Sequence, residues 1–347
     1  MNKTLREYGI KLGHLPTGKH NSITDVAGVK VGHMTLDSSN IKTGVTAIIP
    51  HEGNVFREKL VAASHVINGF GKSQGLVQID ELGTIETPII LTNTLSVGIA
   101  HKAVVQYMLE RNDDIGDTTG TVNPIIGECN DGVLNEIRIP SVSEHHIIDA
   151  LNNAGVEFQQ GNVGAGTGMV CYELKGGIGS ASRILDLGGT KFTVGILVLS
   201  NFGSMEDLMI RGNPVGEKIK ERISRQESGK DKGSIMIILA TDIPLSSLQL
   251  KRLLKRTQSG IARTGGYTGN GSGEVAIGFT TANKVFHYEE DAFVEQRVIH
   301  EDLLDMVFKA TVEATEEAIL NSLICSSTTI GRNDKKVFSL IDFSDLL

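Results

Sequence analysis

The chain has 347 residues, of which 40% are hydrophobic and 21% charged, and its net charge is −8 at pH 7. This length and apolar content are enough for a large core, and the acidic balance argues against a nucleic acid or an anionic membrane as partner, because both need clustered basic residues. The three cysteines are odd in number and far apart, which argues against a disulfide framework and a paired-cysteine zinc site. We therefore expect a small molecule as the partner.

In the first half of the chain, apolar runs and alternation predict strands followed by two helices. Strands are expected at residues 29–31, 44–50, 60–68 and 88–93. A helix is expected at residues 97–111, where apolar side chains fall on one face, and a second at residues 143–153, with Ser143 as its N-cap.

A dense polar segment, Gly-Glu-Cys-Asn-Asp-Gly at residues 127–132, lies between these two helices. One interpretation is a turn held by side-chain hydrogen bonds. The other is a pocket wall that presents the carboxylates of Glu128 and Asp131. The residues themselves leave both interpretations open.

The glycine-rich loop at residues 161–168 has no nucleotide-binding context. A dinucleotide site needs a helix after such a loop, whereas residues 169–174 predict a strand and a second glycine loop follows at residues 176–179. A long strand is then expected at residues 192–199. Asn201 lies just past its end, where a side-chain amide can face a cleft.

The bond between Gly233 and Ser234 is the most unusual feature of the chain. Residues 211–233 are charged and polar and predict an exposed linker, and a strand begins at once with Ser234. Glycine leaves this peptide bond open to attack by the serine hydroxyl. Cleavage would create a first residue with both a nucleophile and an α-amine, the arrangement of an N-terminal-nucleophile hydrolase. By itself the pair also fits a loop that ends at a buried strand.

Three further elements are expected after this strand. Pro244 opens a helix that buries its leucines. A helix at residues 301–322 is the last strong element. The buried leucines are predicted to be Leu245, Leu248, Leu253 and Leu254. Between the helices, a glycine-rich loop leads into a strand that ends near residue 281. Ser272 and Glu274 lie on one side of this extended segment, so both can face the nucleophile, unless the loop is only a turn with exposed polar side chains.

In combination and in this order, these segments resemble the DmpA-like family of N-terminal-serine aminopeptidases, which includes L-aminopeptidase/D-esterases and β-peptidyl aminopeptidases. The match covers about residues 10–325, and the residues that carry it are 21–33, 128–132, 161–168, 201–203, 233–234, 240–242 and 271–274. The resemblance implies an α/β fold, a four-layer α/β/β/α sandwich of the DmpA/ornithine acetyltransferase type. It also implies a tetramer of cleaved protomers.

The same resemblance implies that Ser234 is the self-released nucleophile, Ser272 and Glu274 its polar partners, and Asn201 an oxyanion-hole donor. Glu128 or Asp131 is a candidate for binding the free amine of the substrate. A free α-amine has a pKa of about 7.7 to 8.0, so it can accept the hydroxyl proton and no histidine is needed.

The sequence thus predicts a self-processing serine aminopeptidase that acts on small peptides, amides or esters. We expect a single catalytic domain over residues 1–347, cleaved into 1–233 and 234–347, without metal or cofactor. Because no signal-peptide run or membrane span is present, we expect it in the cytoplasm. One alternative is an ornithine acetyltransferase-like acyltransferase, whose threonine nucleophile argues against it here. The other is an uncleaved, glycine-rich protein that binds small molecules.

Overall fold

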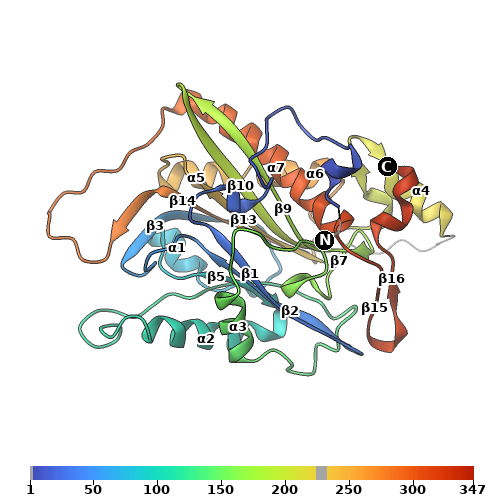
Figure 1. The fold of residues 1–347 in the computed structure, drawn as a ribbon, viewed down its shortest axis with the longest axis horizontal. Helices are drawn as coiled ribbons and strands as arrows, with labels where there is room; N and C mark the ends of the chain where they lie inside the picture. Colours follow the sequence, from blue (N-terminus) through green and yellow to red (C-terminus); the bar gives the residue numbers. More distant parts are fainter. Residues whose placement is uncertain (1–2, 224–232) are drawn as a thin grey trace.

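The strands form two sheets that pack face to face in a computed structural model that describes residues 3–223 and 233–347 (Figure 1). The smaller sheet has the order β1-β2-β5-β6, and only its β5–β6 pair is parallel. Its strands are β1 (Lys30–Ser38), β2 (Ile41–Ile49), β5 (Ile89–Asn93) and β6 (Ile125–Cys129).

The larger sheet has the order β4-β3-β14-β13-β10-β9 and a parallel pair, β13–β14, at its centre. Its strands are β4 (Thr84–Ile85), β3 (Glu58–Gly69), β14 (Gly273–Phe286), β13 (Ser234–Thr241), β10 (Thr190–Asn201) and β9 (Gly177–Leu187). Every residue of β13 is buried. This explains its unbroken apolar run, because a central strand covered on both faces has no polar side.

Helices α2 and α3 cover the outer face of the smaller sheet, and α5, α6 and α7 cover that of the larger sheet (Figure 1). The helices of the described part of the chain are α1 (Leu76–Leu82), α2 (Val97–Leu109), α3 (Glu144–Asn152), α4 (Val215–Arg222), α5 (Ser247–Leu254), α6 (Thr257–Arg263) and α7 (Leu304–Ile324). One core lies between α2, α3 and the smaller sheet, a second between the sheets, and a third between the larger sheet and α5, α6 and α7. These three cores separate four layers and confirm the predicted α/β/β/α sandwich.

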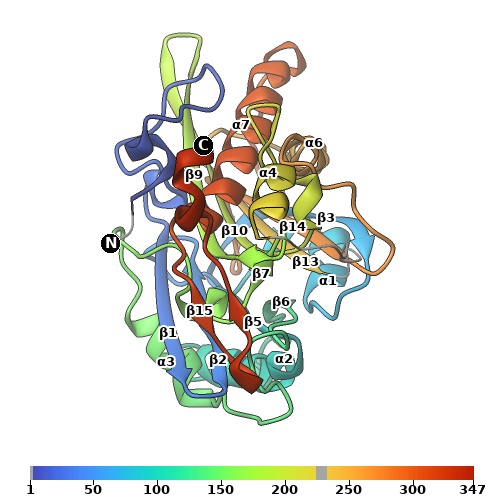
Figure 2. The ribbon, with the colours of Figure 1, turned by 90° about the vertical axis from the view of Figure 1, so that its right-hand side faces the viewer.

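Three two-stranded pairs lie outside the sheets. They are β7 (Val170–Cys171) with β8 (Leu174–Lys175), β11 (Met209–Ile210) with β12 (Asn213–Pro214), and β15 (Thr329–Ile330) with β16 (Lys336–Val337). In Figures 1 and 2 the β15–β16 hairpin, in red, extends along the side of the sandwich. None of the helices in the described part of the chain has the length and apolar character needed to cross a membrane.

Several local expectations are wrong. Residues 211–223 are not an open linker, because α4 buries Val215 and Ile219 there, while residues 224–232 lie outside the described part of the chain. Ser246, not Pro244, caps α5, and Leu248 is 71% exposed on that helix. Residues 169–174 form a hairpin instead of one strand.

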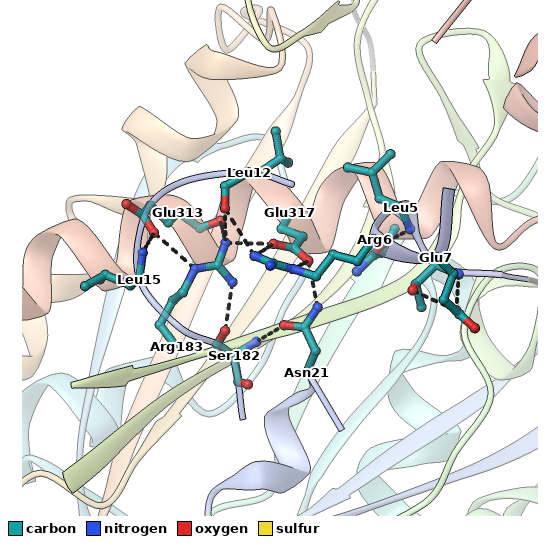
Figure 3. Close-up of polar contacts among 12 residues, drawn as sticks. Leu5, Arg6, Glu7, Leu12, Leu15, Asn21, Ser182, Arg183, Glu313 and Glu317 are labelled. Atoms are coloured by element: carbon teal, nitrogen blue, oxygen red, sulfur yellow. Dashed lines mark hydrogen bonds and ion pairs between the residues drawn. The ribbon is translucent and has the colours of Figure 1, made fainter. Parts of the chain in front are cut away.

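A set of buried and half-buried polar side chains joins the N-terminal segment to β9 and α7 (Figure 3). We call it the Arg183 cluster, and its members are Arg6, Asn21, Arg183, Glu313 and Glu317. Glu317 accepts hydrogen bonds from Arg6, Asn21 and Arg183, and Glu313 accepts one from Arg183 at 3.1 Å. Two guanidinium groups balance two carboxylates, so the cluster is neutral although Arg183 and Glu317 are fully buried.

Candidate active site

The Gly233–Ser234 bond lies at the end of the larger sheet, where β13 begins. Ser234 pairs with Asn201 of β10 on one side and with Gly273 of β14 on the other. Its hydroxyl donates to the carbonyl oxygen of Gly233 at 2.7 Å, and the backbone N–H of Gly273 donates to the same oxygen at 3.0 Å. The carbonyl that Ser234 would attack is therefore within reach of its hydroxyl and already polarised by a second donor.

Only glycine fits at position 233. A Cβ atom there would lie 1.9 Å from the carbonyl oxygen of Asn201 and 2.5 Å from the Cα of Phe202. The glycine thus lets two backbones approach closely, and it leaves its own carbonyl uncovered by a side chain.

Asn201 holds three segments together beside Ser234. Its Oδ1 accepts the N–H of Val170 at 2.8 Å, and its Nδ2 donates to the carbonyl oxygen of Asn130 at 3.0 Å. A side-chain amide has two N–H groups, so one hydrogen of Asn201 is left for a further acceptor. In this uncleaved arrangement it is the N–H of Gly273 that contacts the Gly233 carbonyl, a donor that the sequence did not indicate.

Ser272 and Glu274 flank the residue that pairs with Ser234. The β13–β14 register places Gly273 opposite Ser234 and Glu274 opposite Ile235. Both side chains are almost completely buried, and within the described residues the Ser272 hydroxyl has no hydrogen-bond partner. The fold thus brings Ser234, Asn201, Ser272 and Glu274 to one end of three adjacent strands.

Glu128 and Asp131 follow β6 of the smaller sheet, and both are buried. The carboxylate of Glu128 accepts the N–H of Lys72 at 2.8 Å and the hydroxyl of Thr94. Oδ1 of Asp131 accepts from Asn135 at 3.0 Å, while its Oδ2 has no partner among the described residues. Burial raises the pKa of Asp131 to about 6, against the opposing effects of the neighbouring Thr43 and Asn135 side chains.

Neither of these carboxylates reaches the pocket beside Gly233, which has a volume of about 450 Å³. The pocket is lined by Asn130, Gly132, Val133, Ile137, Val170, Glu173, Asn201, Phe202, Gly203, Gly233 and Arg332. The sequence did not indicate Glu173 or Arg332 as pocket residues.

Glu173 reaches the pocket from a strained turn. Tyr172 and Glu173 form the two-residue connection between β7 and β8, with φ of 51° and 57°. Such a turn normally takes Asn-Gly, so nothing in this stretch signalled a hairpin. Non-glycine residues are kept in this conformation where the surrounding structure demands it, often at functional sites.

Lys175 explains the two glycine loops. Its ammonium group is fully buried and donates to the carbonyl oxygens of Gly166, Met169 and Gly176 at 2.9, 2.8 and 2.6 Å. Burial lowers the pKa of Lys175 to about 7. The loops fold around this side chain and support the β7–β8 hairpin instead of holding a nucleotide.

The candidate site contains no cluster of metal-binding side chains within residues 3–223 and 233–347. A model of the family described as "Peptidase family S58" matches residues 21–337. The chain belongs to peptidase family S58. Membership makes it a hydrolase of the N-terminal-nucleophile type and an aminopeptidase, as the sequence predicted, and disfavours the acyltransferase and the binding protein.

Similar proteins and solved structures support this assignment. A β-peptidyl aminopeptidase of Sphingosinicella microcystinivorans is 35% identical over 350 residues, covering 94% of this chain and 87% of the relative. A crystal structure of a Pyrococcus horikoshii OT3 protein matches with a TM-score of 0.94 and 50% identity, covering 99% and 98% of the two chains. The L-aminopeptidase D-Ala-esterase/amidase of Ochrobactrum anthropi, a prototype of the serine aminopeptidases with a variant Ntn-hydrolase fold, matches with a TM-score of 0.90 and 34% identity, covering 99% of each chain.

Proposed function

We propose that this S58 aminopeptidase activates itself by cleaving Gly233–Ser234 and then uses Ser234 to release the N-terminal residue of short peptides, amides or esters. The observation that carries the proposal is the contact of the Ser234 hydroxyl with the carbonyl of its own peptide bond, at 2.7 Å. The fragments would be residues 1–233 and 234–347. Gly233 would then be the last residue of the first fragment, next to the pocket that it lines.

Self-cleavage would follow an N-to-O acyl shift. The Ser234 oxygen attacks the Gly233 carbonyl carbon, the Gly273 N–H stabilises the negative charge on its oxygen, and the C–N bond breaks as the hydroxyl proton passes to nitrogen. Water then hydrolyses the ester and frees Gly233 as a carboxylate. Ser272 and Glu274 are the nearest candidates for carrying the proton, because the α-amine does not yet exist.

During turnover, the free α-amine of Ser234 would accept the proton of its own hydroxyl. The spare amide hydrogen of Asn201 would stabilise the oxyanion, a contribution of roughly a hundred- to a thousandfold in rate. We assign the substrate amine to Glu128 or Asp131, with Glu128 favoured because it contacts the loop at Lys72 that follows β3, next to Gly273. We further propose that the enzyme needs no cofactor, assembles as a tetramer and acts in the cytoplasm.

Intact mass spectrometry of the purified protein tests the nucleophile. Wild type should give two fragments of about 25 and 12 kDa, dividing 37.2 kDa by length, whereas Ser234→Ala should stay one chain and hydrolyse no amino-acid p-nitroanilide. Ser204→Ala is a matched control, since Ser204 is also buried but follows β10. Active wild-type enzyme that remains a single chain would refute the proposal.

A further inference from the structure

The pocket beside Gly233 carries one positive charge on its described wall, that of Arg332. We propose that Arg332 binds the free α-carboxylate of a short peptide, so that dipeptides with an ionised C-terminus are the preferred substrates. This inference rests on the proposed function and specifies the substrate class of the same site.

The β15–β16 hairpin holds Arg332 against the pocket wall. The N–H of Arg332 donates to the carbonyl oxygen of Leu134 at 2.8 Å. At the preceding Gly331, a Cβ atom would lie 2.3 Å from the same oxygen. The hairpin therefore needs glycine there to approach the wall, and this close contact fixes where the Arg332 side chain begins.

The segment that the hairpin contacts is connected to Ser234 by hydrogen bonds. Leu134 belongs to the turn after Asn130, in which its N–H donates to the carbonyl oxygen of Asp131 at 3.1 Å. Asn130 accepts the amide of Asn201, and Asn201 pairs with Ser234. The position of Arg332 is thus tied to that of Ser234 through backbone contacts and the side-chain amide of Asn201.

The guanidinium group of Arg332 makes only a weak ionic contact with the protein. Within the described residues its one ionic contact is with Glu136, where Nη1 and Oε1 lie 3.6 Å apart, too far for a hydrogen bond. The side chain is one-third exposed. A guanidinium has five N–H donors and favours a carboxylate held by two parallel hydrogen bonds, so Arg332 keeps its capacity for such a ligand.

The rest of the wall suits the side chains of a short peptide. Val133, Ile137, Val170 and Phe202 offer apolar surface to side chains, and Glu173 supplies the one described negative charge. A volume of about 450 Å³ is near the lower end of small-molecule sites. In a dipeptide the carboxylate lies one residue, about 3.5 Å of chain, beyond the scissile carbonyl, so both groups fit in one pocket of this size.

The test compares alanyl-alanine, alanyl-alaninamide and alanine p-nitroanilide as substrates of the mature enzyme. Wild type should prefer the acid to the amide in kcat/KM, and this preference should shrink as ionic strength rises. Arg332→Gln should lower kcat/KM for the acid by about ten- to a hundredfold, the usual weight of a charge-assisted pair, and leave the amide and the anilide within about threefold. Arg332→Lys keeps the charge without the paired donors and should fall between.

Arg138→Gln is the matched control, because Arg138 lies in the same loop as Ile137 and is exposed outside the pocket. An equal loss for acid and amide in Arg332→Gln would indicate a structural role and overturn the inference. A wild type without preference for the acid would also overturn it, while its aminopeptidase activity on the amide would leave the proposed function standing. Failure of wild type to hydrolyse any of the three would overturn both.

Discussion

The Arg183 cluster and the surroundings of Ser234 both bury polar groups, but they treat these groups differently. In the Arg183 cluster, Glu317 accepts four hydrogen bonds and Arg183 donates to side chains and to the carbonyl oxygens of Leu12, Ser182 and Glu313 (Figure 3). Around Ser234, the Ser272 hydroxyl has no partner within the described residues, and the Ser234 hydroxyl contacts only its own peptide bond among the bonds described.

This contrast indicates that the Arg183 cluster stabilises the fold and that the Ser234 site carries out the reaction. A buried polar group without a partner costs about 1–3 kcal/mol, so folds normally remove it. The Arg183 cluster satisfies its groups and thereby joins the N-terminal segment to β9 and α7, which lie on opposite sides of the proposed cleavage point in the chain. The Ser234 site keeps the Ser272 hydroxyl without a partner among the described residues, and such a group is available to a reaction that develops new charge and moves protons.

The largest expected effect on stability comes from breaking the satisfied cluster. Arg183→Met leaves two carboxylates in the core with only Arg6 as counter-ion, and we expect a loss of about 3–5 kcal/mol. The measurement is urea unfolding followed by circular dichroism. Arg222→Met is the control, because the ion pair of Arg222 with Asp345 is exposed and should not shift the midpoint.

If these roles are correct, the Arg183 cluster takes no part in self-cleavage or in substrate turnover. The folded fraction of Arg183→Met should therefore cleave itself and turn over substrate at rates close to those of wild type. A normal midpoint with a lost activity would reverse the roles that we assign to the two regions.

A smaller effect, on rate and not on stability, is expected at Ser272 and Glu274. Ser272→Ala should lower kcat by about ten- to a hundredfold and Glu274→Gln by about a hundred- to a thousandfold, with slower maturation, because they manage the proton of Ser234. Removing the unpartnered Ser272 hydroxyl should leave the unfolding midpoint unchanged or slightly raised.

Groups that act as one unit are not additive, so the double variant Ser272→Ala/Glu274→Gln should be little worse than Glu274→Gln alone. If Glu274→Gln matures and hydrolyses a p-nitroanilide at the wild-type rate, the proton must be carried by the α-amine alone or by the segment of Glu128 and Asp131.

The sequence predicted most of the fold because strong local patterns agree with it. The apolar run from Ser234, the capping residue Ser143 and the alternating strands all appear where expected. It failed where tertiary contacts decide. The α4 residues look like a polar linker because only Val215, Gly216 and Ile219 touch the core. The Tyr172–Glu173 turn carries none of the residues that such a turn favours, and the buried Lys175 after it is held by three backbone carbonyl oxygens from the glycine loops and the residue between them.

The same division holds for the site. Ser234, Asn201, Ser272 and Glu274 lie within motifs that the sequence displays, and the structure brings them together. The Gly273 N–H joins them through strand register. Glu173 and Arg332 come from two separate hairpins, and that of Arg332 lies almost a hundred residues after Ser234. A backbone donor has no residue type to signal it, and an arginine in a short hairpin looks like any surface arginine.

The smallest effect concerns Asp131, which lies between the two extremes because one of its oxygens is satisfied and the other has no described partner. Its pKa rises from an ordinary 3.8 to about 6 in the fold, so the folded state binds its proton more tightly than the unfolded state. Stability is therefore lost as the pH rises from about 4 to about 6, by roughly 1–3 kcal/mol.

In the Asp131→Asn variant this side chain stays neutral. The stability of the variant relative to wild type should increase over the same interval and then level off. Urea midpoints of both proteins at pH 4, 5, 6 and 6.5 measure this, below the pH at which Lys175, with a pKa of about 7, loses most of its charge. If the difference in urea midpoint between the two proteins stays constant over this range, the pKa of Asp131 is not shifted by folding. The Asp131 carboxylate would then be as well satisfied as the carboxylates of the Arg183 cluster.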